Sequence, residues 1–184
     1  MKMRLSTALL ACAILPAAVA AQQMAAPAVS ANPVADAFRN MAKRQATILT
    51  GAAEAMPADK YNYRPTPAQM SFAQVQTHLA EGNDLLCGKI GGVTAPKRTA
   101  VDSTAGKDAL VARLKETFAF CEEALEKLDD SKLGETMSLF GPNPYSRAAV
   151  ILITMGDWQD HYSQEAIYLR LNGLLPPTAR RGSM

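Results

Sequence analysis

The chain is organised around one polar stretch inside a long apolar helical run, Asp157-Trp158-Gln159-Asp160-His161-Tyr162-Ser163-Gln164. Asp157 and His161 are four residues apart, so a helix places them one turn apart on the same face. The other of the two histidines, His78, lies upstream in Thr77-His78-Leu79-Ala80-Glu81. The face that carries Asp157 and His161 is otherwise mostly apolar. These polar groups therefore either satisfy buried hydrogen bonds or hold a metal ion together with His78.

The first 20 residues have the layout of a secretory signal peptide. Lys2 and Arg4 precede an apolar run from Leu5 to Ala17, and small residues follow it. This run is too short and wrongly flanked for a membrane-spanning helix, and no later stretch is long enough. We therefore expect a signal peptide at 1–20, a flexible leader at 21–32, and an exported protein, periplasmic or extracellular, without a membrane span.

Charge and composition describe the mature chain further. Cleavage removes two of the 19 basic residues and none of the 17 acidic residues, so the mature chain is balanced in charge. A balanced chain has no electrostatic footprint for nucleic acid or for an anionic membrane. The length suits one domain, and 48% apolar residues are enough for a substantial core.

Four segments repeat apolar residues at the three- and four-residue steps of amphipathic helices. They run from Pro33 to Met56, from Ser71 to Ile90, from Leu110 to Leu128, and from Pro144 to about Leu171. We find no convincing strand alternation and no internal repeat. The sequence therefore predicts an all-α four-helix bundle within residues 33–175, followed by a short tail at 176–184. The polar loop from Gly91 to about Gly106 is long enough to cross the end of the bundle, which allows parallel neighbours.

Two cysteines remain after the signal peptide, Cys87 and Cys121. They do not form a Cys-x-x-Cys pattern, which argues against a redox motif or a structural zinc site. An exported protein can keep a disulfide, but two small buried residues would leave the same pattern. A bridge is easiest if the two helices that carry the cysteines run parallel.

The histidines and acids suit metal chemistry. His78 on the second helix and the Asp157/His161 pair on the fourth supply three ligands and leave positions for water or substrate, as in a catalytic zinc site. Two nitrogens and one carboxylate also suit iron(II), manganese or nickel. Glu81, one turn after His78, and Asp160, beside His161, are candidates for catalytic proton transfer. Without the metal, the same polar residues would form a buried hydrogen-bond network.

One glycine belongs to the buried stripe of the second helix, and His78 lies beside that stripe. Gly82 follows His78 by one turn, where a glycine costs roughly 1 kcal/mol of helix stability relative to alanine. We expect it to leave room next to the imidazole.

The order and spacing of the longer motifs carry a family resemblance. They are Arg64-Pro65-Thr66-Pro67-Ala68-Gln69-Met70-Ser71-Phe72, then Val75-Gln76-Thr77-His78-Leu79-Ala80-Glu81-Gly82-Asn83, then Asp160-His161-Tyr162-Ser163-Gln164, then Tyr168-Leu169-Arg170-Leu171-Asn172-Gly173 with Pro176-Pro177. Together they resemble the DinB-like family, and most closely its exported members. The resemblance covers essentially the whole mature domain.

This resemblance implies a bundle with a crossover connection and a divalent metal, most often zinc or nickel, held by three histidines. In the family, one histidine comes from the second helix and a His-x-x-x-His pair comes from the fourth. His78 matches the first and His161 matches the second member of the pair, whereas the first member of the pair falls on Asp157. An aspartate also ligates but makes a harder site, so iron and manganese join the candidate ions.

Two functions are consistent with these observations. The first is an exported metal-dependent enzyme of the hydrolase or transferase type, acting on an unknown small molecule, with Glu81 or Asp160 handling protons. The second is a non-catalytic binding or structural module that has lost the metal site. The thiol transfers known in the wider family use cytosolic thiols, which are hard to reconcile with export. A homodimer through an exposed helix face is a further expectation, and no residue identifies that face.

Overall fold

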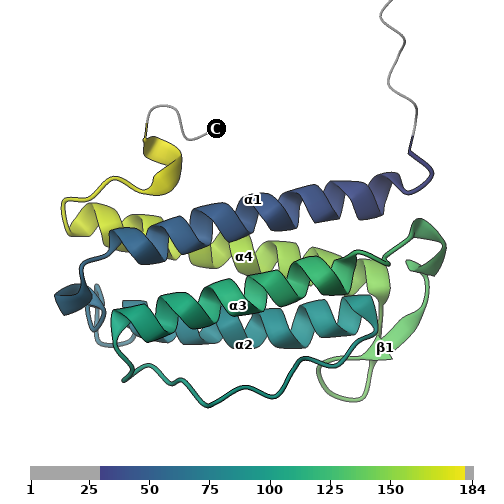
Figure 1. The fold of residues 1–184 in the computed structure, drawn as a ribbon, viewed down its shortest axis with the longest axis horizontal. Helices are drawn as coiled ribbons and strands as arrows, with labels where there is room; N and C mark the ends of the chain where they lie inside the picture. The colour runs from purple at the N-terminus through teal and green to yellow at the C-terminus, as the bar shows by residue number, and fades with distance from the viewer. Residues whose placement is uncertain (1–29, 181–184) are drawn as a thin grey trace, which may run out of the picture.

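The computed structural model describes residues 30–180 and confirms the all-α prediction (Figure 1). The helices are α1 (Pro33–Ala55), α2 (Phe72–Gly91), α3 (Lys107–Leu125) and α4 (Arg147–Leu171), with short 3-10 turns η1 (Ala58–Lys60), η2 (Asp130–Lys132) and η3 (Pro177–Ala179). The strands β1 (Thr136–Ser138) and β2 (Pro144–Ser146) form one antiparallel hairpin. No helix within 30–180 is long and apolar enough to cross a membrane. The predicted signal peptide and nearly all of the leader lie outside the described residues.

The connection between α2 and α3 sets the order of the bundle. Residues 92–106, the crossover loop, run back along the length of α2 before α3 begins, so these two helices lie parallel (Figure 1). α1 and α4 run in the opposite direction. The crossover predicted from the sequence is therefore present. It leaves α2 and α4 antiparallel, with the middle of one beside the middle of the other.

Trp158 joins all four helices from the centre of the core. Its ring, 1% exposed, lies 5.8 Å from the ring of Phe38 on α1 and 5.8 Å from that of Phe118 on α3. Its indole N–H donates to Oδ1 of Asn83 on α2 at 2.7 Å, and the Asn83 amide donates to Thr117 on α3 at 3.2 Å. The polar tip of the largest core residue is thus satisfied. This network fixes the rotation of α4, and with it the direction of the neighbouring Asp157.

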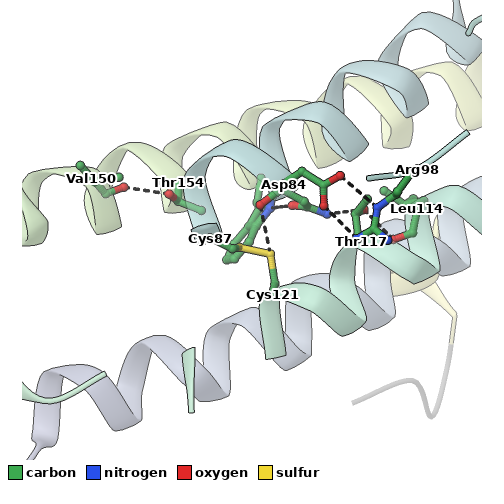
Figure 2. Close-up of a disulfide and its surroundings, with 10 residues drawn as sticks. Asp84, Cys87, Arg98, Leu114, Thr117, Cys121, Val150 and Thr154 are labelled. Atoms are coloured by element: carbon green, nitrogen blue, oxygen red, sulfur yellow. Dashed lines mark hydrogen bonds and ion pairs between the residues drawn. A yellow bond between two sulfur atoms is a disulfide. The ribbon is translucent and has the colours of Figure 1, made fainter. Parts of the chain in front are cut away.

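A disulfide joins Cys87 of α2 to Cys121 of α3, with their Cα atoms 5.1 Å apart (Figure 2). Each cysteine is about 15 residues into its helix, so the parallel arrangement brings them to one level. Nearby, Arg98 of the crossover loop donates two hydrogen bonds of 3.0 Å to the Asp84 carboxylate of α2 (Figure 2). Covalent and ionic contacts therefore both hold the crossover in place.

The entry to α4 differs from the sequence prediction. Pro144 was expected to open the helix, and this is wrong, because Pro144 lies in β2 and α4 begins at Arg147. Ser146 is the N-cap, and its hydroxyl accepts from the backbone N–H of Ala149 at 3.1 Å. Proline has no N–H to donate, so the edge of a two-stranded hairpin tolerates it. Strands of three residues are too short to show an alternating pattern.

Both ends of the described chain are held by distant residues. The Asp130 carboxylate accepts from the backbone N–H groups of Val34 at 3.0 Å and Ala35 at 2.8 Å, and so caps α1 from another part of the chain. At the other end, Pro177 is buried and the Thr178 N–H donates to the Tyr162 hydroxyl at 3.0 Å. The predicted tail is thus packed on the bundle through Pro177 and hydrogen-bonded to it at Thr178.

The disulfide makes a testable contribution to stability. A Cys87→Ala/Cys121→Ala double variant is expected to lose about 2–4 kcal/mol of unfolding free energy, because the reduced chain gains entropy when it unfolds. Urea unfolding with and without dithiothreitol measures this loss. Dithiothreitol should destabilise the wild type and leave the double variant unchanged. If dithiothreitol does not change the stability of the wild type, and the double variant is equally stable, the disulfide does not contribute to the unfolding free energy.

Candidate metal centre

His78, Asp157 and His161 come together where the middle of α2 meets α4. The Nε2 atoms of His78 and His161 each lie 3.4 Å from the same atom, Oδ1 of Asp157. One ligand atom from each of the three residues lies within 4.8 Å of the other two. The two imidazole rings meet edge to face, with centroids 4.6 Å apart. The three ligand candidates taken from the sequence therefore converge on one point.

Gly82 of α2 lies beside the Asp157 carboxylate. A methyl group built on Gly82 would lie 3.4 Å from Oδ2 of Asp157. We expected Gly82 to leave room beside an imidazole, whereas its neighbour is the aspartate. Oδ1 is the Asp157 oxygen near the two histidines, and Oδ2 is the oxygen beside Gly82. A methyl group at position 82 would make ordinary van der Waals contact with Oδ2.

The two distances to Oδ1 of Asp157 are long for hydrogen bonds and match the spacing of ligands around a metal ion. A charge-assisted N–H···O bond is normally about 2.7–2.9 Å long, and the two distances here are 3.4 Å. Ligand atoms about 2.0–2.1 Å from a tetrahedral ion are separated by roughly 3.4 Å. Two imidazole nitrogens and a carboxylate oxygen are also ordinary ligands for a divalent ion. The donor set and its geometry therefore fit such an ion.

The site is closed on one side and open on the other. The His161 side chain is 7% exposed and that of Asp157 is 21% exposed, whereas the His78 side chain is 48% exposed. The ligands on α4 are thus held by the core, and His78 forms the solvent side. Of the three side chains, His78 is therefore the one most accessible to solvent.

Asp157 and His161 alter each other's protonation. Burial alone would raise the pKa of Asp157, but hydrogen bonding and charge from His161 and His78 lower it below its usual range. Burial alone would lower the pKa of His161, but the Asp157 carboxylate raises it above its ordinary value. Without an ion, the aspartate is therefore ionised and His161 retains its proton to a higher pH. A metal ion binding here must displace that proton.

The two acids predicted to handle protons lie outside this cluster. Glu81 is exposed and lines an open groove between α2 and the crossover loop, together with Thr77 and Arg98. Asp160 is also exposed, and its Oδ2 accepts from the Gln164 amide at 2.8 Å. Neither carboxylate is hydrogen-bonded to the three donor atoms within residues 30–180, although the charge of Asp160 helps to raise the pKa of His161. Glu81 and Asp160 therefore remain candidates for proton transfer, and a bound substrate would have to bring the reacting group within their reach.

A fourth polar group near the site was missed in the sequence. Glu165 is fully buried, and its Oε1 accepts from the Gln76 amide across the α2–α4 interface. Burial raises the pKa of Glu165 to about 8, and the Gln76 hydrogen bond only partly opposes this rise. One signal was available, because Glu165 follows His161 by four residues and so shares its helix face. The position of Gln76 beside it depends on tertiary packing and gave no such signal.

Comparison with known proteins gives this architecture a family. A family model described as the DinB superfamily matches residues 41–164. A DinB-like protein from Bacillus subtilis is 20% identical with a TM-score of 0.64, and the match covers 79% of this chain and 99% of that one. A DinB-like protein from Bacillus cereus is 14% identical with a TM-score of 0.65, covering 77% and 95%. A conserved protein from Enterococcus faecalis is 16% identical with a TM-score of 0.61, covering 75% and 96%. At these identities the solved structures support the fold alone, and no curated protein matches the chain.

Substitution of Gly82 tests how tightly α2 fits the aspartate. Gly156 provides a matched control, because a methyl group there meets nothing within 4 Å. Gly156→Ala should stabilise its helix by about 1 kcal/mol. Gly82→Ala should gain less, because its methyl group removes water from the ionised Asp157 carboxylate. Chemical denaturation of both variants measures the difference, and equal gains would show that the contact is looser than described.

Histidine titration tests the coupling between Asp157 and His161. In metal-free protein, Asp157→Asn should lower the pKa of His161, because the neutral amide removes the charge and leaves the burial unchanged. Asp160→Asn is the control and should lower this pKa less, because Asp160 is exposed. Proton NMR can follow the rings, since the chain has only two histidines. A His161 pKa unaffected by Asp157→Asn would contradict the coupling.

Proposed function

This chain belongs to the DinB superfamily, and we propose that it is an exported metal-dependent enzyme in which His78, Asp157 and His161 bind one divalent ion. The observation that carries the proposal is the convergence of both imidazole Nε2 atoms on Oδ1 of Asp157 at 3.4 Å. The family resemblance of the motifs around His78 and His161 supports the same assignment. Zinc and nickel are the first candidates, and the carboxylate ligand also suits iron or manganese.

Each residue has a distinct part in this proposal. A bound divalent ion supplies a Lewis acid that polarises a substrate group or activates a nucleophile. Asp157 contributes the negative charge that offsets part of the ion's charge, and the buried His161 fixes the position of the ion against α4. His78 holds the solvent side, where a small substrate approaches. Glu81 and Asp160 are exposed carboxylates on the two flanking helices, and one of them accepts or delivers the proton.

We further propose that the reaction is a hydrolysis or a group transfer on a small molecule outside the cytoplasm. The signal-peptide layout of residues 1–20 supports export. The Cys87–Cys121 disulfide adds independent support, because such bonds persist in oxidising compartments. Activities that depend on cytosolic thiols are not part of the proposal for this reason.

One observation favours a second candidate, a binding or structural module without a metal. A histidine that binds a metal normally donates its other ring N–H to an acceptor. Nδ1 of His161 is buried and has no hydrogen-bond partner among the described residues. In addition, Asp157 occupies the position at which the family resemblance implies a histidine ligand, so one of the three expected imidazoles is missing. In this alternative the three residues form a polar contact between α2 and α4 and carry no chemistry.

Metal affinity separates the two functions. Isothermal titration of zinc, nickel and manganese into protein purified without a nickel column should give about one ion per chain. His78→Ala and Asp157→Ala should each weaken binding by more than about 100-fold, since each removes a direct ligand and even the loss of an outer partner costs 10–100-fold. Asp157→His should bind zinc more tightly than the wild type, because imidazole is the softer ligand.

The control for these variants is Glu122→Gln, which removes an exposed carboxylate on α3 that pairs with Lys43. Its affinity should equal that of the wild type. No saturable binding of any of the three ions would favour the module without a metal. Equal affinity in the wild type and in Asp157→His would contradict the assignment of Asp157 as a ligand.

A further inference from the structure

Gln76 and Glu165 form a second polar contact between the helices that carry the proposed metal centre. Both side chains have no exposed surface. The Gln76 amide Nε2 donates to Oε1 of Glu165. The two remaining oxygens, Oε1 of Gln76 and Oε2 of Glu165, are buried and have no hydrogen-bond partner among the described residues. Two side chains already in contact are therefore each left with one unused acceptor.

An ionised Glu165 does not suit these surroundings. A carboxylate only accepts hydrogen bonds, so it cannot satisfy Oε1 of Gln76. None of the ion pairs within residues 30–180 includes Glu165, so its charge would be buried without a cation beside it. A buried charge without a partner costs several kcal/mol, and such groups normally take up a proton instead.

One proton satisfies both unused oxygens. A protonated Oε2 of Glu165 can donate to Oε1 of Gln76, while the Gln76 amide continues to donate to Oε1 of Glu165. The two side chains then form a closed ring with two hydrogen bonds, and neither carries a charge. We infer that Glu165 holds a proton at neutral pH in a cyclic acid–amide pair with Gln76, and that this pair positions α2 against α4 beside the metal centre. The proton on Glu165 does not depend on the proposed function, whereas the positioning role rests on it.

The surroundings of the pair are consistent with a neutral group. On α1, the buried polar residue Gln45 is uncharged, and its amide donates to the sulfur of Met41. The titratable neighbours are His161, one turn earlier on α4, and Tyr61, whose hydroxyl donates to the Ala53 carbonyl at 2.7 Å. Burial raises the pKa of Glu165 to about 8, which agrees with the geometry.

The position of the pair explains how it acts on the centre. Gln76 precedes His78 by two residues, and Glu165 follows His161 by four. Any slip between α2 and α4 would change the distance from His78 to the two ligands on α4. A ring of two hydrogen bonds resists such a slip and adds no charge that would compete with Asp157 for the ion. Glu165 is thus a positioning residue and not a ligand.

Infrared spectroscopy tests the proton directly. The difference spectrum between the wild type and Glu165→Gln at pH 7 should contain the carbonyl band of a protonated carboxyl group, shifted in heavy water. Glu165→Gln is a matched variant, because its amide can donate to Gln76 Oε1 and accept from Gln76 Nε2 without a proton. A band of an ionised carboxylate in place of the protonated band would overturn the inference that Glu165 holds a proton.

A pH profile adds a second readout that packing alone would not change. Glu165 has a pKa of about 8 in the folded protein and about 4.5 in the unfolded chain, so only the folded state holds the proton between these values. The stabilisation is complete below pH 4.5 and is lost as the pH rises towards 8. Relative to Glu165→Gln, the folding equilibrium constant of the wild type should fall up to tenfold per pH unit in this window. Parallel profiles would overturn the inference.

Zinc affinity tests the positioning role. Glu165→Gln should bind zinc within about twofold of the wild type, whereas Glu165→Leu, which removes both hydrogen bonds, should bind about 10-fold more weakly or worse. Equal affinity for wild type and Glu165→Leu would overturn the positioning role.

If Glu165→Leu does not fold, Gln76→Glu replaces it, because two carboxyl groups can form the same ring only when protonated. Its zinc affinity should then fall as the pH rises relative to Glu165→Gln, and parallel affinity profiles would overturn the role. A wild type that binds no metal would overturn the proposed function. The infrared band would still show whether Glu165 is protonated in the pair with Gln76.

Discussion

The packing of α2 against α4 is the contact on which the rest of this structure depends. It brings two histidines, an aspartate, a glutamate and a glutamine into one interface of a mostly apolar bundle. Burying so many polar groups is unfavourable unless each finds a partner or a ligand. His78, Asp157 and His161 are spaced for a shared ion, whereas Gln76 and Glu165 can satisfy each other with one proton. The interface therefore combines the candidate metal centre with a contact that holds α2 and α4 in register.

The remaining helices keep this interface rigid. Trp158 fixes the rotation of α4 through stacking on α1 and α3 and through its hydrogen bond to Asn83 of α2. The Cys87–Cys121 disulfide ties α2 to α3 and so limits movement of the helix that carries His78. A ligand set spread over two helices needs this kind of support, because errors of about 0.5 Å weaken a site. Stability and the proposed function thus depend on the same contacts.

The sequence predicted the parts of this structure that local periodicity determines. The helices follow from apolar steps of three and four residues, and Asp157 and His161 share a face because they are four residues apart. His78 entered through the family resemblance and through being the second of only two histidines. The hairpin that takes up Pro144, the capping of α1 by Asp130 and the partner of Glu165 were not predicted. Each depends on a contact between residues far apart in the chain, which no local pattern encodes.

We propose that this bundle binds a divalent ion through two imidazoles and one carboxylate. X-ray absorption at the zinc edge of zinc-loaded protein can identify these ligands, because imidazole rings scatter characteristically beyond the directly bound atoms. We expect two imidazoles in the wild type and three in Asp157→His, with no sulfur ligand in either. A spectrum without imidazole scattering, or one that is identical in the two proteins, would contradict this proposal.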